Sequence, residues 1–229
     1  MSDPSITEGS VGLVETKNVT IPLPPEGLVL ESGESLAELQ VAYESYGAKA
    51  PAGDNVVYIC HALTGDAHVA GYHSAQDKKY GWWDAMVGPG KGIDTNRFHV
   101  ICANILGGCM GTTGPSALNP RTGLPYGSSF PAITTGDMVH VQYLLLQHLG
   151  IKRLAAVIGG SFGGMQVLEW VRRYPHVVDK GVCIASAMSL SAQALAFDIV
   201  GRNAIQADSA WAERLMAEAM HTPLSTTSG

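Results

Sequence analysis

The stretch of sequence that decides the fold is residues 157–166, VIGGSFGGMQ. An apolar, strand-like run ends at Ile158, and apolar residues recur at helical spacing after Gly164. Residues 159–163 fit the pattern G-x-S-x-G, in which glycines on both sides of a serine allow a strand and a helix to approach closely. The pattern predicts a strand, a tight turn that exposes the Ser161 hydroxyl, and a helix whose N-terminus favours negative charge at that point.

Length and charge limit the class of protein. A chain of 229 residues is long enough for one α/β domain with a substantial core. The formal net charge is −6 and no basic run exceeds two residues, so the electrostatic footprint of a nucleic-acid-binding protein is missing. No apolar run approaches the ~20 residues that span a bilayer, and the first residues do not resemble a secretory signal. We expect a cytoplasmic protein that binds neither nucleic acid nor membrane.

The four cysteines do not form a disulfide or metal pattern. Cys60, Cys102 and Cys183 lie in apolar, strand-like runs, whereas Cys109 lies in a glycine-rich loop, and there is no C-x-x-C pair. We expect the first three to be buried free thiols and Cys109 to be the one candidate for reactivity.

The first part of the chain predicts a mixed sheet. Residues 1–26 are mostly polar and end in a proline-rich run, which predicts an N-terminal tail packed loosely on the domain. Residues 28–34 and 39–43 predict an antiparallel hairpin at a sheet edge. The continuously apolar runs 56–60 and 98–103 are typical of strands buried on both faces of a sheet.

Helices and strands alternate in the second part of the chain. A helix capped by Thr135 and ended by Gly150 leads into the serine turn, and residues 181–186 predict one more buried strand. We therefore expect an α/β core over residues 27–190, with a mostly parallel central sheet and helices on both faces. Residues 191–229 predict the start of a helical cap, with one helix after Ser191 and a second from Trp211.

The loop after the first buried run, residues 61–68, is the candidate for the other half of an oxyanion hole. In a fold with a nucleophile turn, a backbone N–H of this loop faces the reacting carbonyl. The candidate donors are the N–H groups of Leu63 and Phe162. We expect His61 and His68 to satisfy local backbone groups, and we expect no metal site, because their spacing suggests no third ligand.

Two glycine-rich segments, residues 81–95 and 104–116, are long loops at predicted strand ends. Loops in that position carry the ligand contacts of an α/β sheet, so we expect both to border the pocket. The second segment lacks the spacing and the lysine of a phosphate-binding P-loop.

The nucleophile also needs a base and a carboxylate, which follow the serine in this arrangement. Downstream of Ser161 the histidines are His176 and His221. His176 should lie a helix length from the serine, and His221, with Asp198 or Asp208, has no strand before it. The favoured interpretation is that the chain ends before the strands that would carry the acid and the histidine.

Several stretches match one family in the right order: residues 61–68 (HALTGDAH), 81–84 (GWWD), 104–115 (NILGGCMGTTGP), 127–131 (GSSFP) and 159–166 (GGSFGGMQ). Together they resemble the homoserine O-acetyltransferases, an acyltransferase branch of the α/β-hydrolase superfamily. The resemblance covers residues 12–211, and the family's late Asp and His and its homoserine-binding arginine have no matching positions. It implies an α/β-hydrolase fold that lacks its last strands.

The resemblance implies a two-step acyl transfer in methionine biosynthesis. Ser161 would take the acetyl group from acetyl-CoA, with the Leu63 and Phe162 N–H groups stabilising the oxyanion, and L-homoserine would then accept the acetyl group. Thr64 and Gly65 are the candidate substrate-binding residues. The family commonly forms homodimers and uses neither a metal nor a cofactor, since acetyl-CoA is a substrate.

Three alternatives remain open. With succinyl-CoA as donor the same machinery is a homoserine O-succinyltransferase, and with water as acceptor it is an esterase. Because the Asp and His of a triad are missing, the chain could instead be an inactive partial α/β-hydrolase chain.

Overall fold

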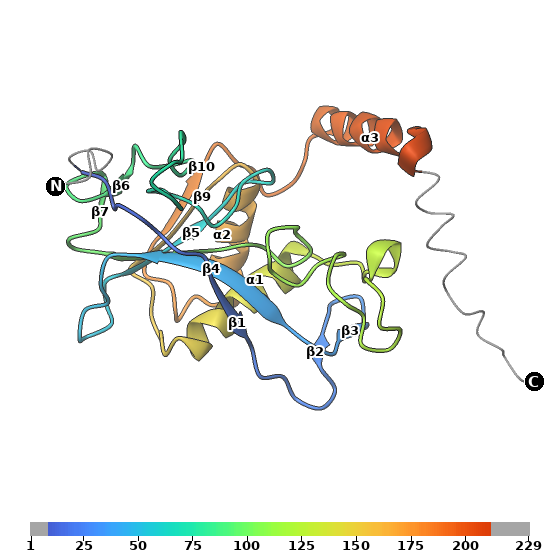
Figure 1. Cartoon of the computed structure of the whole chain (residues 1–229), viewed down its shortest axis with the longest axis horizontal. Helices are drawn as coiled ribbons and strands as arrows, with labels where there is room; N and C mark the ends of the chain where they lie inside the picture. The colour runs from blue at the N-terminus through green and yellow to red at the C-terminus, as the bar shows by residue number, and fades with distance from the viewer. Residues whose placement is uncertain (1–8, 212–229) are drawn as a thin grey trace, which may run out of the picture.

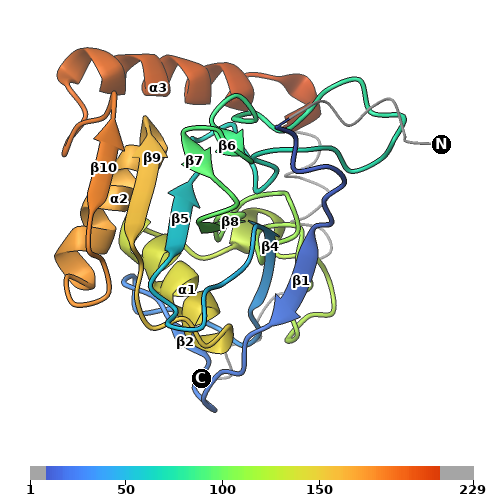
Figure 2. The same cartoon turned by 90° about the vertical axis from the view of Figure 1, so that its left-hand side faces the viewer.

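A six-stranded sheet organises residues 9–211, the part of the chain that the computed structural model describes (Figure 1). Its strands are β1 (Lys17–Thr20), β4 (Gln40–Tyr46), β5 (Val56–Cys60), β8 (His99–Ala103), β9 (Ala156–Gly160) and β10 (Gly181–Ile184). Their order is β1-β4-β8-β5-β9-β10, so β5 lies in the middle of the sheet (Figure 2). β4 pairs antiparallel with both β1 and β8, whereas the β8–β5, β5–β9 and β9–β10 pairs are parallel, which confirms the predicted mixed sheet.

The edge of the sheet differs from the prediction. The expected hairpin is split: β2 (Leu28–Val29) and β3 (Ser35–Leu36) form a small separate sheet, and β4 lies inside the large one. The edge strand is β1, within the segment 1–26 that we expected to be a loose tail. β1 has one apolar side chain, Val19, so its sequence carries almost no strand signal. Its pairing with β4 is what makes it a strand.

One face of the sheet is covered by two helices, α1 (Thr135–His148) and α2 (Phe162–Arg173). α1 begins with a capping box between Thr134 and Asp137, so the cap lies one residue before the predicted Thr135. It ends as predicted before Gly150, which adopts a φ of 65°. The helices meet the sheet at the fully buried Trp170.

The opposite face of the sheet is covered by chain that is not helical. Two-residue strands β6 (Val87–Gly88) and β7 (Ile93–Asp94) pair with each other there, and their apolar side chains pack on the sheet with Val57, Ile59, Val69, Val100 and Cys102. Within residues 9–211 the helices α1 and α2 therefore cover one face, where the sequence predicts helices on both. A 3-10 turn, η1 (Gly127–Ser129), lies in the long connection to α1.

The last described elements are exposed. All four residues of β10 are exposed, with Val182 at 41% and Ile184 at 42%, so the predicted buried strand at 181–186 is an exposed edge strand. The strand pairs with β9 alone, and nothing in the described range covers its other side. The predicted helix after Ser191 is present as α3 (Ala192–Gln206), but it has no buried residue and projects away from the sheet (Figure 1). The second predicted cap helix, from Trp211, lies almost entirely outside the described residues.

None of the helices in the described range is both long enough and apolar enough to span a membrane.

Candidate active site

The predicted strand, turn and helix are present around Ser161. The serine lies between β9 and α2 with φ 53° and ψ −122°, a backbone conformation that is strained for any residue other than glycine. Its N–H donates to the carbonyl of Ile184 on β10 (3.0 Å), and its carbonyl accepts from the Ser186 hydroxyl (2.7 Å). Neighbouring chain thus holds the turn on both sides and leaves the serine exposed at the N-terminus of α2.

The glycines of the G-x-S-x-G pattern are required by contact. A Cβ at Gly163 would collide with the carbonyl of Cys60 at the end of β5, and one at Gly159 would collide with the carbonyl of Gly163. At Gly160 the nearest atom would be a carbonyl oxygen 3.7 Å away, which is ordinary contact. The first and last glycines therefore allow β5, β9 and α2 to meet, and the middle one is not needed for space.

Two buried glutamines tie the loop after β5 to the helices. The Gln166 amide donates to the carbonyl of His61 (3.1 Å) and accepts from the Gln142 amide on α1 (2.7 Å). Gln142 in turn accepts from the indole N–H of Trp170 (2.7 Å). Both glutamines are fully buried. Sequence reasoning missed this chain of amides, although polar residues inside apolar helix faces are a usable signal.

His61 is a buried neutral histidine. Its Nδ1 lies 2.8 Å from the carbonyl of Ala62, which identifies Nδ1 as the protonated nitrogen, and its Nε2 has no partner. Burial lowers the pKa of the ring, against the opposing effects of the Ala62 carbonyl and the Asp66 charge. The expectation that His61 satisfies a local backbone group is confirmed. His68 instead hydrogen-bonds the side chain of Glu44 (3.0 Å).

The two candidate oxyanion donors are available. Phe162 is the first residue of α2, so its N–H has no acceptor within the helix. Leu63 lies in an exposed turn closed by a hydrogen bond from the Gly65 N–H to the Ala62 carbonyl (2.9 Å). Among residues 9–211, neither the Phe162 nor the Leu63 N–H donates to a protein acceptor. Thr64 is exposed in the same turn, and the structure does not assign it or Gly65 a ligand.

Among residues 9–211, no general base is in place at the serine. Within the described residues, neither an imidazole nor a carboxylate hydrogen-bonds the Ser161 hydroxyl. His176 lies beyond the far end of the 12-residue helix α2, about 18 Å along its axis, as expected. Asp198 on α3 and Asp208 after it are exposed, and His221 lies outside the described residues.

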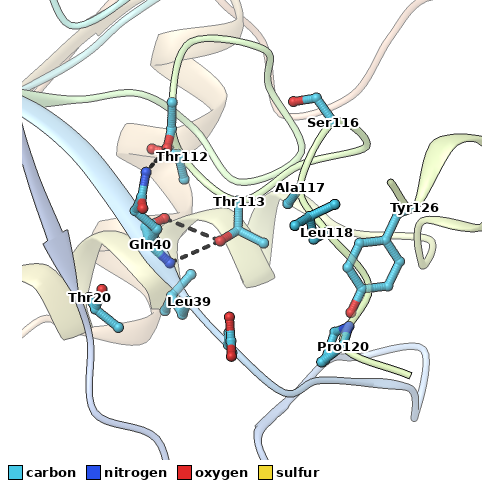
Figure 3. Close-up of a pocket in the computed structure, with 12 residues that line it drawn as sticks. Thr20, Leu39, Gln40, Thr112, Thr113, Ser116, Ala117, Leu118, Pro120 and Tyr126 are labelled. Carbon is cyan, nitrogen blue, oxygen red and sulfur yellow. Dashed lines mark hydrogen bonds between the residues drawn. The ribbon is translucent and has the colours of Figure 1, made fainter. Parts of the chain in front are cut away.

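The described chain also has a cavity of about 380 Å³ elsewhere (Figure 3). It lies against the ends of β1 and β4, which contribute Thr20 and Gln40 to its wall. There the Thr113 hydroxyl accepts from the Gln40 N–H (2.9 Å), and Tyr126 lines the cavity from the connection to α1. The predicted loop 104–116 contributes to its wall, but the loop 81–95 and the serine turn do not. This cavity is therefore separate from the candidate active site.

The fold and the serine turn together define a class of protein. A sequence model described as "alpha/beta hydrolase fold" matches residues 55–229, and the chain belongs to that family. Within it, the chain is 55% identical over 203 residues to a homoserine O-acetyltransferase of Carboxydothermus hydrogenoformans, covering 89% of this chain and 52% of the relative.

Two further comparisons include other activities of the same fold. A homoserine O-succinyltransferase of Magnetococcus marinus is 54% identical over 199 residues, which cover 87% of this chain and 50% of the relative. The crystal structure of esterase E22 superimposes with a TM-score of 0.80 at 36% identity, covering 87% of this chain and 55% of that one. The chain spans about half the length of the curated relatives it matches.

Proposed function

We propose that the chain carries the acyl-accepting half of a homoserine O-acetyltransferase, with Ser161 as the nucleophile. The observation that supports this most directly is the exposed serine at positive φ on the N-terminus of α2, next to the Phe162 N–H, which has no protein acceptor among residues 9–211. The acetyl donor is acetyl-CoA and the acceptor is the hydroxyl of L-homoserine, the substrate implied by the name of the relatives.

The reaction proceeds in two balanced steps. The Ser161 oxygen attacks the thioester carbonyl and passes its proton to a base. The Phe162 and Leu63 N–H groups stabilise the oxyanion that forms, and each donor of this kind typically lowers the activation free energy by about 3 kcal/mol. Coenzyme A leaves as the thiol with that proton. The homoserine hydroxyl then attacks the acetyl-serine, gives up its own proton, and releases O-acetylhomoserine with the serine regenerated.

The base and its carboxylate are proposed to come from residues other than those described. The support for this is the absence of a partner at the Ser161 hydroxyl within residues 9–211, together with the greater length of the relatives. The resemblance also supports a cytoplasmic homodimer. Size-exclusion chromatography with light scattering tests the dimer, and a monomer at working concentration would contradict it.

Chemical rescue tests the nucleophile in this chain. We expect incubation with acetyl-CoA and added imidazole, which can act as the base, to add one acetyl group that peptide mapping by mass spectrometry places on Ser161. Ser161→Ala removes the adduct, and Ser116→Ala, an exposed serine by the separate cavity, keeps it. Acetylation of both variants to the same extent would refute the assignment.

The donor and the acceptor are tested by coenzyme A release. Under the same rescue conditions, release should require homoserine for turnover beyond one equivalent and should be faster with acetyl-CoA than with succinyl-CoA. A preference for succinyl-CoA would support the activity named for the Magnetococcus marinus relative. Continued release without homoserine would support an esterase, the activity named for E22.

A further inference from the structure

A cluster of one carboxylate and two imidazoles lies beside β4 and includes no residue of the serine turn. Glu44 on β4 meets His68 and His73, which belong to the non-helical chain after β5. Glu44 Oε2 lies 3.0 Å from His68 Nδ1, and Glu44 Oε1 lies 2.7 Å from His73 Nε2. One possible ligand atom from each of the three residues lies within 4.8 Å of the others.

The carboxylate of this cluster is buried and firmly held. The Glu44 side chain is 1% exposed, while His73 is 46% exposed, so the cluster opens to solvent on the His73 side. The Tyr46 hydroxyl donates to one carboxylate oxygen (2.7 Å) and the Thr16 hydroxyl to the other (2.8 Å). Burial alone would raise the pKa of Glu44, but the hydrogen bonds from its neighbours outweigh it and lower the pKa to about 2. The group is therefore a fixed carboxylate ion at neutral pH.

Two imidazoles share this one negative charge. The rings of His68 and His73 lie 3.8 Å apart between centroids, so both can approach one ion beside Glu44. A metal ion in this position accepts one lone pair from each neutral ring and one from the carboxylate. Each ring can supply the lone pair by carrying its proton on the nitrogen that faces away from Glu44.

We propose that Glu44, His68 and His73 form a binding site for a divalent transition-metal ion of the zinc class. Two imidazole nitrogens and one carboxylate oxygen are a donor set typical of zinc, whereas magnesium and calcium prefer oxygen ligands alone. Ligand atoms around a tetrahedral zinc lie about 3.3 Å apart. One ligand atom from each of the three residues already lies within 4.8 Å of the others, so no separation between them needs to close by more than about 1.5 Å. Thr16 Oγ1, 3.5 Å from His73 Nε2, and water are the candidates for the fourth position.

None of the three ligands belongs to the serine turn, so the ion would stabilise the fold and would take no part in a reaction at Ser161. Its ligands come from β4 and from the chain that covers the helix-free face of the sheet, and Thr16 belongs to the segment before β1. An ion bound here would cross-link three stretches that are distant in sequence. His68 also ends the loop 61–68 that carries Leu63, so the ion would limit the motion of that loop. From the sequence we expected no metal site, because the spacing of the histidines in the loop after β5 suggests no third ligand. The structure supplies that ligand from a distant part of the chain, since Glu44 lies on β4, before β5.

The test is metal binding by the full 229-residue chain after treatment with a chelator. We expect zinc chloride to bind at one equivalent in isothermal titration calorimetry and to raise Tm, and cobalt chloride to give visible absorption bands of a four-coordinate ion. Magnesium chloride at the same concentration should do neither. Hydrogen exchange of residues 66–80 should slow when zinc is present.

Variants separate coordination from hydrogen bonding. His73→Ala should weaken zinc binding by at least about tenfold, and His73→Gln, which can still donate to Glu44, should weaken it comparably. His148→Ala, an exposed histidine in the last turn of α1, should bind zinc like the unmodified chain. The proposal is overturned if zinc does not bind saturably, if magnesium binds equally well, or if both His73 variants retain full zinc affinity. It is also overturned if the His73 variants lower Tm equally with zinc and with chelator, which would indicate a hydrogen-bond network only.

Discussion

Gly163 lies where α2 meets the end of β5, and a Cβ there would collide with the Cys60 carbonyl. We predict that Gly163→Ala lowers the free energy of unfolding by about 1–3 kcal/mol, the usual cost of overpacking. Gly160→Ala is the matched control, since its Cβ meets only ordinary contact, and it should be neutral or stabilising by up to about 1 kcal/mol. Urea denaturation measures both. Equal losses of stability at the two positions would show that the close contact with the Cys60 carbonyl is not the reason for a glycine at position 163.

The cysteines offer a second prediction at the residue scale. Cys60 and Cys102 are buried, and burial raises the pKa of both thiols, whereas Cys109 and Cys183 are exposed. We expect iodoacetamide to alkylate only Cys109 and Cys183 in the native chain, and all four in urea, as read by peptide mass spectrometry. The sequence predicted a buried Cys183. Protection of Cys183 in the native chain would mean that β10 is covered in solution.

At the scale of elements, the amide chain of Gln142 and Gln166 holds α1, α2 and the loop after β5 together. Gln166→Leu removes the acceptor of the Gln142 NH2 group and the side-chain donor to the His61 carbonyl, and we expect it to lower the free energy of unfolding by about 1–3 kcal/mol. Gln142→Leu should cost a similar amount, since Trp170 then loses its acceptor.

The double variant provides the check on that coupling. Because the two glutamines share one hydrogen bond, the loss in Gln142→Leu/Gln166→Leu should be smaller than the sum of the two single losses. Thermal and urea unfolding of the four chains measure the difference. Additive losses would mean that the two amides act independently.

The elements that sequence could predict are those with a strong local signal. β5 and β8 are continuous apolar runs, and α1 and α2 show helical spacing, so each was expected near its observed position. The predictions for β1 and β10 were wrong. Whether β1 is a strand and whether β10 is buried both depend on the chain that lies beside them. β1 becomes a strand by pairing with β4, and β10 is exposed because the described chain places nothing on its outer side.

The same distinction applies to the candidate site. The turn around Ser161 is predicted from one continuous stretch, the G-x-S-x-G pattern with the strand-like run before it and the helical spacing after it. Gln142 and Gln166 come from different helices, and Glu44 reaches His68 and His73 from another strand. No spacing rule joins such residues, because only the completed sheet brings them together.

At the scale of the whole molecule, buried neutral histidine makes stability depend on pH. The pKa of His61 is lowered from 6.5, so below about pH 6.5 the unfolded chain takes up a proton that the folded chain does not. The free energy of unfolding should therefore fall as the pH drops below that value, until the folded-state pKa is reached. His99 and His140, whose pKa values burial also lowers, act in the same direction.

The variant His61→Asn isolates this contribution. Asparagine retains a donor for the Ala62 carbonyl and does not titrate, so the pH dependence below pH 6.5 should become shallower than in the unmodified chain. Urea unfolding of both chains, measured at about every half pH unit between about pH 7 and pH 5, tests this expectation. Identical slopes for the two chains would show that folding does not lower the pKa of His61.

The central position of β5 has a consequence for how the chain is made. Cys60 pairs with Gly159, and the chain between them carries β8 and α1. A nascent chain on the ribosome therefore holds β5 with one side unpaired until β9 has emerged, and closing so long a loop makes this step slow. The serine turn follows β9, so a chain interrupted during synthesis before α2 exposes apolar strand edges and lacks the turn between strand and helix.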